Sequence, residues 1–191
     1  MNESGVNEVK NGLSWMGRHI LIERDEIDPQ KCSYGFPWKH DSTCYNFRMP
    51  KECVPADRIG EMLGGEGSKE IETAVIGCEL EDYGFLADMT NLRQLYIYAG
   101  GKIKEIDFVE NLVWLQQLYV GESHIGSLDS LVRLLTEKKR LMDQAEDAWE
   151  RLGYSMEGIF IETDQEGLTK KTLKETGLYV SEIILRRSAG D

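Results

Sequence analysis

Hydrophobic residues follow one spacing that occurs three times between residues 71 and 135. Segments beginning at Ile71, Leu92 and Leu115 carry apolar residues at their relative positions 1, 4 and 6, and these starts are 21 and 23 residues apart. The alternation of positions 4 and 6 predicts a short strand with one buried face. Apolar residues then recur at every third position, which favours a tight 3-10-like return to the next strand. Each unit therefore reads as strand, turn and return, and it can bury its apolar side only against its neighbours.

This pattern resembles the leucine-rich repeat family, in its class of about 22 residues with internalin-like repeats. The resemblance covers residues 71–135, about a third of the chain. The position where the family usually has Asn is held by Glu79, Gly100 and Ser123, of which only Ser123 can donate the usual inward hydrogen bonds to the backbone. The resemblance implies an α/β solenoid with a curved parallel sheet, whose concave face binds another protein.

Residues 13–70 are expected to cover the N-terminal end of the repeats, because a stack of repeats needs covered ends. Within them, Arg18–Glu23 reads as a strand, residues 28–50 as a loop and Asp57–Leu63 as a short helix. The first 12 residues are expected to form a mobile tail.

Residues 136–191 are expected to hold a helix and degenerate repeats that act as the C-terminal cover. The third repeat lengthens into a predicted helix from Ser130 to Leu152, with Trp149 in its apolar stripe and Gly153 as its stop. Strands are expected over residues 158–162 and 180–185, around a helix near residues 169–175. The predicted fold is therefore a short leucine-rich-repeat solenoid with about five parallel strands and a long helix inserted after the third repeat.

Aromatic and amide side chains gather on one predicted face of the sheet. Positions 3, 5 and 7 of each repeat point away from the core, opposite to positions 4 and 6. Position 5 holds Val75, Tyr96, Tyr119, Phe160 and Ile184. The predicted partner-binding residues are Gln94, Tyr96, Tyr98, Gln117, Tyr119 and Phe160. Tyrosine buries a large area at a low rotamer cost, which suits a binding surface. Two alternatives remain: the rings are simply good strand residues, or a cover segment packs against them.

The acidity of the chain limits its partners. With 34 acidic and 22 basic residues the formal net charge is −12, which argues against sequence-independent binding of nucleic acid and against an anionic membrane surface. Positions 3, 5 and 7 of the three repeats carry no charge, so we expect an uncharged binding face. A cytoplasmic location is expected, because the sequence shows neither a signal-peptide pattern nor an apolar run of membrane-spanning length.

The cysteines and histidines do not form a recognisable metal motif. Four potential zinc ligands fall close together: Cys32, His40, Cys44 and Cys53. They lack the short ligand spacings of structural zinc sites, so buried free thiols are favoured and no metal or cofactor is expected. Cys78 is expected to fill space in the core, and His124 to be a solvated turn residue.

The sequence therefore predicts a non-enzymatic module that binds an unidentified protein. An alternative is a cytoplasmic inhibitor or immunity-type protein for a basic partner, since acidic surfaces speed such association. A different class is a small hydrolase or transferase that uses the Cys32–Cys53 region with His19 or His40. A purely structural role is the last alternative.

Overall fold

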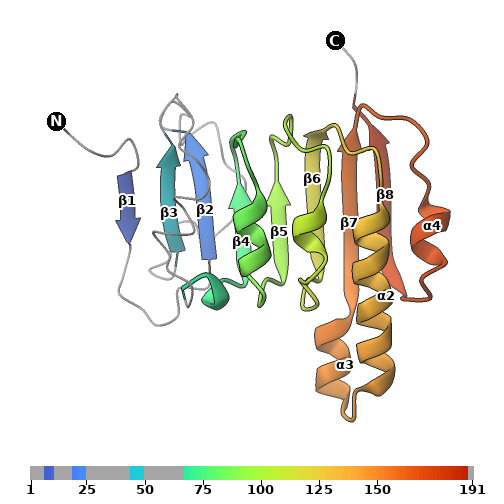
Figure 1. Cartoon of the computed structure of the whole chain (residues 1–191). Coiled ribbons are helices and arrows are strands. Elements are labelled where there is room, and N and C mark those ends of the chain that lie inside the picture. The colour runs from blue at the N-terminus through green and yellow to red at the C-terminus, as the bar shows by residue number, and fades with distance from the viewer. Residues whose placement is uncertain (1–6, 11–18, 25–43, 50–66, 189–191) are drawn as a thin grey trace.

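The computed structural model describes residues 7–10, 19–24, 44–49 and 67–188, and the eight strands within them form one sheet (Figure 1). The strands are β1 (Asn7–Lys10), β2 (His19–Arg24), β3 (Cys44–Met49), β4 (Thr73–Ile76), β5 (Gln94–Ile97), β6 (Gln117–Ser123), β7 (Met156–Thr163) and β8 (Val180–Arg187). The helical segments are η2 (Gly84–Asp88), η3 (Asp107–Val109), α2 (Asp129–Gln144), α3 (Ala148–Tyr154) and α4 (Lys170–Lys174). The strand order is β1-β3-β2-β4-β5-β6-β7-β8, and every pair except β1 with β3 is parallel.

The repeat strands stack in the register that the spacing predicts. β4, β5 and β6 are parallel neighbours, and Val75, Tyr96 and Tyr119 lie side by side across them. The same row continues through Phe160 of β7 and Ile184 of β8. The expected strands over residues 158–162 and 180–185 and the helix near residues 169–175 are therefore present.

The sheet continues to the N-terminal side of the repeats. β2 pairs in parallel with β4, and its Ile20 and Ile22 are fully buried in register with Ala74 and Ile76. β3 forms within residues expected to be a loop, and β1 within the expected tail, so the sheet has eight strands where about five were expected. β2, which was expected as a strand, has the same two-residue alternation as a repeat strand, so it extends the repeat sheet and gives β3 an edge on which to pair. The expected helix Asp57–Leu63 lies outside the described residues.

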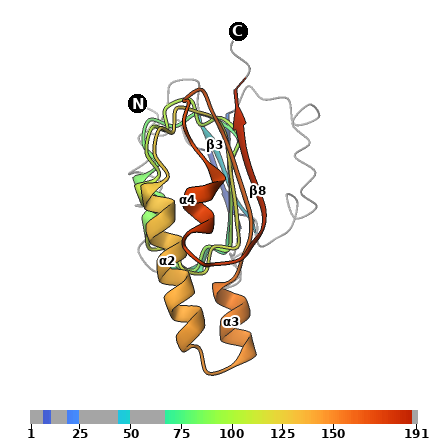
Figure 2. The ribbon, with the colours of Figure 1, turned by 90° about the vertical axis from the view of Figure 1, so that its right-hand side faces the viewer.

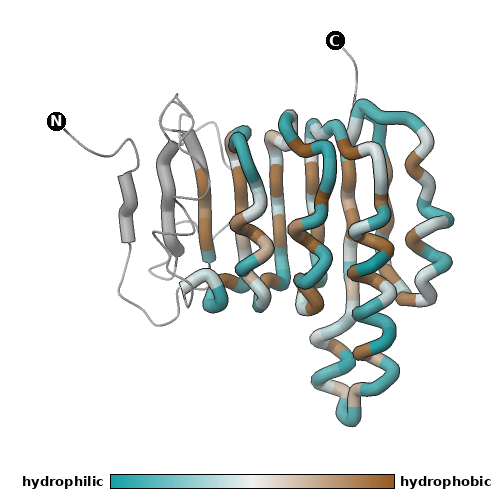
Figure 3. Tube along the Cα trace, in the orientation of Figure 1, coloured by the Kyte–Doolittle hydropathy of each residue, from teal (hydrophilic) through white to brown (hydrophobic). Residues whose placement is uncertain are grey.

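The main core is a layer between the sheet and the turns and helices on one of its faces (Figures 1 and 2). Positions 4 and 6 of the strands and the three-residue spacing of the returns supply it, and Leu86, Met89, Val109 and Leu112 are all fully buried. Figure 3 shows these hydrophobic positions along the strands and returns, with hydrophilic positions between them. Among the described residues, no helix combines the length and the apolar character needed to cross a membrane.

The helix expected from Ser130 to Leu152 is two helices. α2 ends at Gln144, Ala145 has an extended backbone, and the Asp147 carboxylate accepts a hydrogen bond of 2.7 Å from the Glu150 N–H to cap α3. The two helices lie side by side and project beyond the sheet (Figure 1). The prediction of one continuous apolar stripe is therefore wrong at its C-terminal end, where Trp149 is 80% exposed.

α3 is held by a stack of flat side chains. The Trp114 ring stacks on Tyr154 with centroids 4.9 Å apart, and the Arg93 guanidinium lies 5.4 Å from the Trp114 centroid. A Cβ on Gly153 would lie 2.1 Å from Cζ3 of Trp114, so only glycine permits this approach. Gly153 is therefore a contact residue inside α3, and not the helix stop that the sequence predicts.

Side-chain hydroxyls fix the turns after β6 and β7. Ser123 is buried and its Oγ donates to the Glu162 carbonyl at 2.7 Å, while Thr163 Oγ1 donates to the Ile125 carbonyl at 2.8 Å. Each bond satisfies a backbone acceptor where the chain leaves the sheet. The inward hydrogen bonding predicted for Ser123 is thus present, and Thr163 adds an equivalent bond that the sequence analysis missed.

Candidate functional site

Four aromatic rings form a continuous surface on the sheet face opposite the core, called here the open face. We call Tyr96, Tyr98, Tyr119 and Phe160 the aromatic row. The rings of Tyr119 and Phe160 stack with centroids 4.5 Å apart and planes 4° apart. The ring of Tyr98 tilts against Tyr119 at 5.0 Å. All four residues are partly exposed, so the row offers a preformed apolar surface to solvent.

Gly121 makes room for the Tyr119 ring. A Cβ on Gly121 would lie 3.2 Å from Cε1 and 3.3 Å from the hydroxyl oxygen of Tyr119, and 3.1 Å from the Tyr98 carbonyl oxygen. A side chain there would push the ring away from the strand. Glycine at position 7 of the third repeat therefore lets the Tyr119 ring lie close to the strand.

The two predicted glutamines hydrogen-bond within the protein. The Tyr96 hydroxyl donates to Oε1 of Gln117, and Nε2 of Gln117 donates to Oε2 of Glu157 at 2.9 Å. Oε1 of Gln94 accepts a weaker bond of 3.4 Å from the Thr73 hydroxyl. Gln117 thus orients the Tyr96 ring, which is a positioning role that its sequence position alone does not show.

Among the strands whose side chains are described, the open face is accessible from β5 to β8. Val75 lies in the same lateral row as Tyr96, yet it is fully buried, and Leu21 beside it on β2 is 2% exposed. Tyr96 and Tyr98 pack against this buried pair. The outward position predicted for Val75 is therefore a covered one, and the available surface comes from β5 to β8.

A hollow of about 450 Å³ opens beside the aromatic row, and its walls combine rings and carboxylates. Tyr96, Tyr119 and Phe160 contribute rings, while Glu157 and Glu182 contribute carboxylates. Burial, and then the charge of Glu157, raises the pKa of Tyr96. Burial, and then the charge of Glu162, raises the pKa of Tyr119. These phenols therefore stay neutral and remain hydrogen-bond donors at physiological pH.

The open face carries charge, contrary to the expectation of an uncharged surface. Glu157, Glu162 and Glu182 come from β7 and β8, outside the three repeats on which that expectation was based. Glu122, just after position 7 of the third repeat, also acts on Tyr119. Arg186 of β8 is the opposing charge near that ring. The charged residues that border the aromatic row form its rim, which is therefore mainly acidic.

Two of the remaining candidate residues, Cys78 and His124, are described, and they lie in different environments. Cys78 is 3% exposed and belongs to the core, and His124 is exposed with Nδ1 2.7 Å from Oδ2 of Asp164. Within the described part of the chain, no three His, Cys, Asp or Glu side chains gather as metal ligands would. Cys32, His40, Cys53 and the side chain of Cys44 lie outside the described residues.

Comparison with known proteins gives a distant structural likeness. No family model matches the chain, and no curated protein matches it. Among solved structures, it is similar to the crystal structure of an internalin (InlF) from Listeria monocytogenes, with 13% sequence identity and a TM-score of 0.49. The match covers 78% of this chain and 37% of the internalin chain.

Proposed function

We propose that the chain is a non-enzymatic protein-binding module of the leucine-rich-repeat type, which binds its partner with the aromatic row. The observation that supports this most is that Phe160 stacks on Tyr119 and Tyr98 tilts against it, while all three rings stay partly exposed. Rings that hold one another in place lose little conformational freedom on binding, so most of the energy of their burial is available for affinity. The Gln117 bond to Tyr96 adds to this preorganisation.

The acidic rim favours one more specific candidate, an inhibitor or immunity-type protein that binds a basic partner. Glu157 and Glu182 line the same hollow as Tyr96 and Phe160. A Lys or Arg side chain is attracted both by ring faces and by carboxylates, so this lining suits a cationic side chain. The alternative of a Cys/His-dependent enzyme depends on cysteine side chains that lie outside the described part of the chain.

The aromatic row is tested by Tyr96→Ala combined with Tyr119→Ala. We expect capture of the partner to weaken by several kcal/mol, because central aromatic side chains carry most of the energy of such interfaces. The matched control is Trp149→Ala with Tyr179→Ala, which removes two exposed aromatic residues outside the row. Thermal unfolding of each variant is measured, and capture is compared where all are folded. Equal capture by both double variants would overturn the assignment of this face.

The basic partner is tested separately by Glu157→Gln with Glu182→Gln. We expect the association rate to fall and its dependence on salt to weaken, because rim charges act mainly on the encounter. Asp88→Asn with Glu105→Gln removes two exposed charges elsewhere and serves as control. If the tyrosine double variant loses capture but neither charge variant changes the association rate, the binding face is supported and the basic partner is rejected.

A further inference from the structure

β8 leaves one edge of the sheet open. It pairs with β7 along one side, and no described strand pairs with the other. The Ser188 N–H donates to the Thr163 carbonyl at 2.9 Å, so the even-numbered residues of β8 direct their backbone groups toward β7. Successive residues alternate, so Ser181, Ile183, Leu185 and Arg187 direct theirs to the open edge. Such an edge is a template for another strand.

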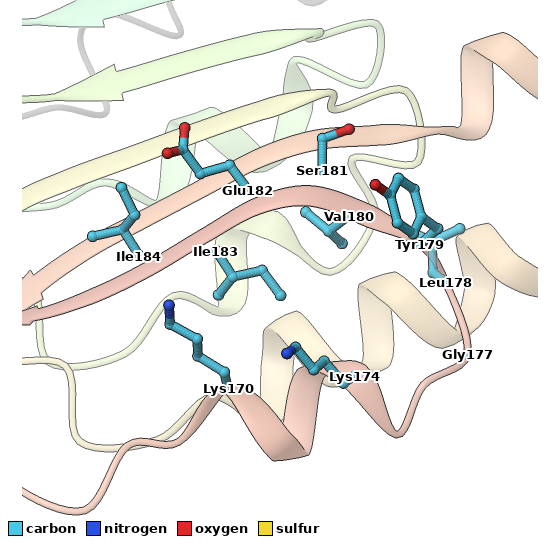
Figure 4. Close-up of a pocket in the computed structure, with 10 residues that line it drawn as sticks. All are labelled: Lys170, Lys174, Gly177, Leu178, Tyr179, Val180, Ser181, Glu182, Ile183 and Ile184. Carbon is cyan, nitrogen blue, oxygen red and sulfur yellow. The ribbon is translucent and has the colours of Figure 1, made fainter.

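A groove runs along this edge between α4 and β8 (Figure 4). Its volume is about 660 Å³, and its lining includes Lys170 and Lys174 of α4 and Val180 and Ile183 of β8. Val180, Ile183 and Leu185 pack against the core but stay partly exposed. The apolar layer is therefore incompletely covered at β8, where further apolar side chains would extend it.

We propose that β8 is a self-association edge, at which two copies of the chain pair antiparallel about a twofold axis at Ile184. In this register Ile183 of each copy lies opposite Leu185 of the other, and Ser181 lies opposite Arg187. All four residues direct their backbone groups outward, so each such pair exchanges two N–H···O bonds. Ile184 of one copy lies opposite Ile184 of the other, with both side chains on the open face.

The charges of β8 match this register. Glu182 comes to lie opposite Arg186 of the second copy, and this pair occurs twice because the axis is twofold. Within one copy, Arg186 lies beside Glu162 of β7, whereas Glu182 lies beside the neutral Gly158. Across the axis the order is therefore Glu162, Arg186 and then Glu182 of the second copy, so neighbouring charges alternate in sign. Neither Glu182 nor Arg186 forms an ion pair with a described residue of its own chain.

Other registers lose these matches. A shift by two residues in either direction sets Glu182 and Arg186 opposite uncharged residues: Ile184 and Val180 in one direction, Ser188 and Ile184 in the other. A shift by one residue sets outward backbone groups against inward ones, so the ladder does not form. The strand is therefore complementary to itself in one register.

The pairing also explains the groove. Leu185 of the second copy enters beside Ile183 and extends the apolar layer, while Lys170 and Lys174 are exposed and keep their ammonium groups in water. The open faces of both copies lie on the same side of the joined sheet. The two aromatic rows would then flank the axis. A repetitive or dimeric partner could contact both rows at once and would bind with higher avidity.

Charge reversal tests the register by sedimentation over a concentration series. The wild-type chain is expected to show a reversible monomer–dimer equilibrium. Glu182→Arg and Arg186→Glu should each weaken dimerisation by roughly tenfold, because each places like charges opposite each other twice. The double variant Glu182→Arg with Arg186→Glu should restore it, and Glu105→Arg, an exposed charge reversal elsewhere, should leave it unchanged.

A cross-link tests the axis independently. Residues opposite each other in a non-hydrogen-bonded antiparallel pair have Cα atoms about 4.5 Å apart, which a disulfide spans. Ile184→Cys should therefore give a disulfide-linked dimer under mild oxidation, whereas Ser181→Cys and the wild-type chain should not. A chain that stays monomeric at every concentration would overturn the proposal, as would a dimer that ignores both the charge reversals and the Ile184 thiol. Either result would leave partner binding by the aromatic row untouched.

Discussion

At the scale of single residues, Lys138 is the most unusual side chain described. It is fully buried, and its Nζ donates to the carbonyls of Val113 and Leu115 at 2.6 and 2.7 Å. Burial, and then the nearby charge of Arg93, lowers its pKa to about 7. A neutral amine has two N–H donors, which match the two carbonyls. Lys138 therefore links α2 to the segment before β6 through two buried hydrogen bonds, and the neutral amine can still form both.

The depressed pKa predicts a rise in stability with pH. Between about pH 7 and pH 10 the unfolded chain binds the proton of Lys138 more tightly than the folded chain does, so the free energy of unfolding increases as pH rises. From pH 7 to pH 9 the contribution is about 2 kcal/mol. Chemical denaturation of the wild-type chain and of Lys138→Met at several pH values checks this. The difference between the two should grow with pH, and parallel curves would contradict the buried, deprotonating lysine.

At the scale of elements, the sequence pattern predicted strands better than helix boundaries. β4 to β8 fall where position 5 of each unit predicts them, because a two-residue alternation is a local property of the chain. The break between α2 and α3 was missed, since Asp147 can cap a helix only once Ala145 has left the helical conformation. Gly153 was read as a stop because the sequence does not show that Trp114 packs on it.

The docking of α3 predicts the effect of Gly153→Ala. In an isolated helix this change would stabilise by about 1 kcal/mol. Here the added methyl overlaps the Trp114 ring, and overpacking of this kind costs about 1–3 kcal/mol, so we expect net destabilisation and a changed tryptophan fluorescence.

Two variants separate this clash from other effects of a methyl group. Trp114→Ala added to Gly153→Ala should remove the further penalty of the methyl. Gly158→Ala is the control, because a Cβ there meets nothing within 4 Å. Unfolding midpoints that do not differ between Gly153→Ala and Gly158→Ala would disprove the contact.

At the scale of the whole molecule, the net charge of −12 predicts that salt stabilises the monomer. Self-repulsion of a chain with this excess of carboxylates weakens as the ionic strength rises. Exposed ion pairs such as Lys171 with Glu175, 3.6 Å apart, are also screened, but each contributes less than about 1 kcal/mol. We therefore expect the unfolding temperature to rise from low to physiological salt, measured by circular dichroism. A falling temperature would mean that ion pairs outweigh the repulsion.

The stacking register and the side-by-side rings of Tyr96, Tyr119 and Phe160 could be predicted from the sequence pattern. Both follow from apolar spacing within short stretches, and equivalent positions of parallel strands must become neighbours. Three features appear only in the folded chain: Val75 is buried, Gln117 hydrogen-bonds to Tyr96 and Glu157, and carboxylates of β7 and β8 border the rings. These features depend on which segments meet across the sheet, and contacts between distant segments are not encoded in any local pattern of polar and apolar residues.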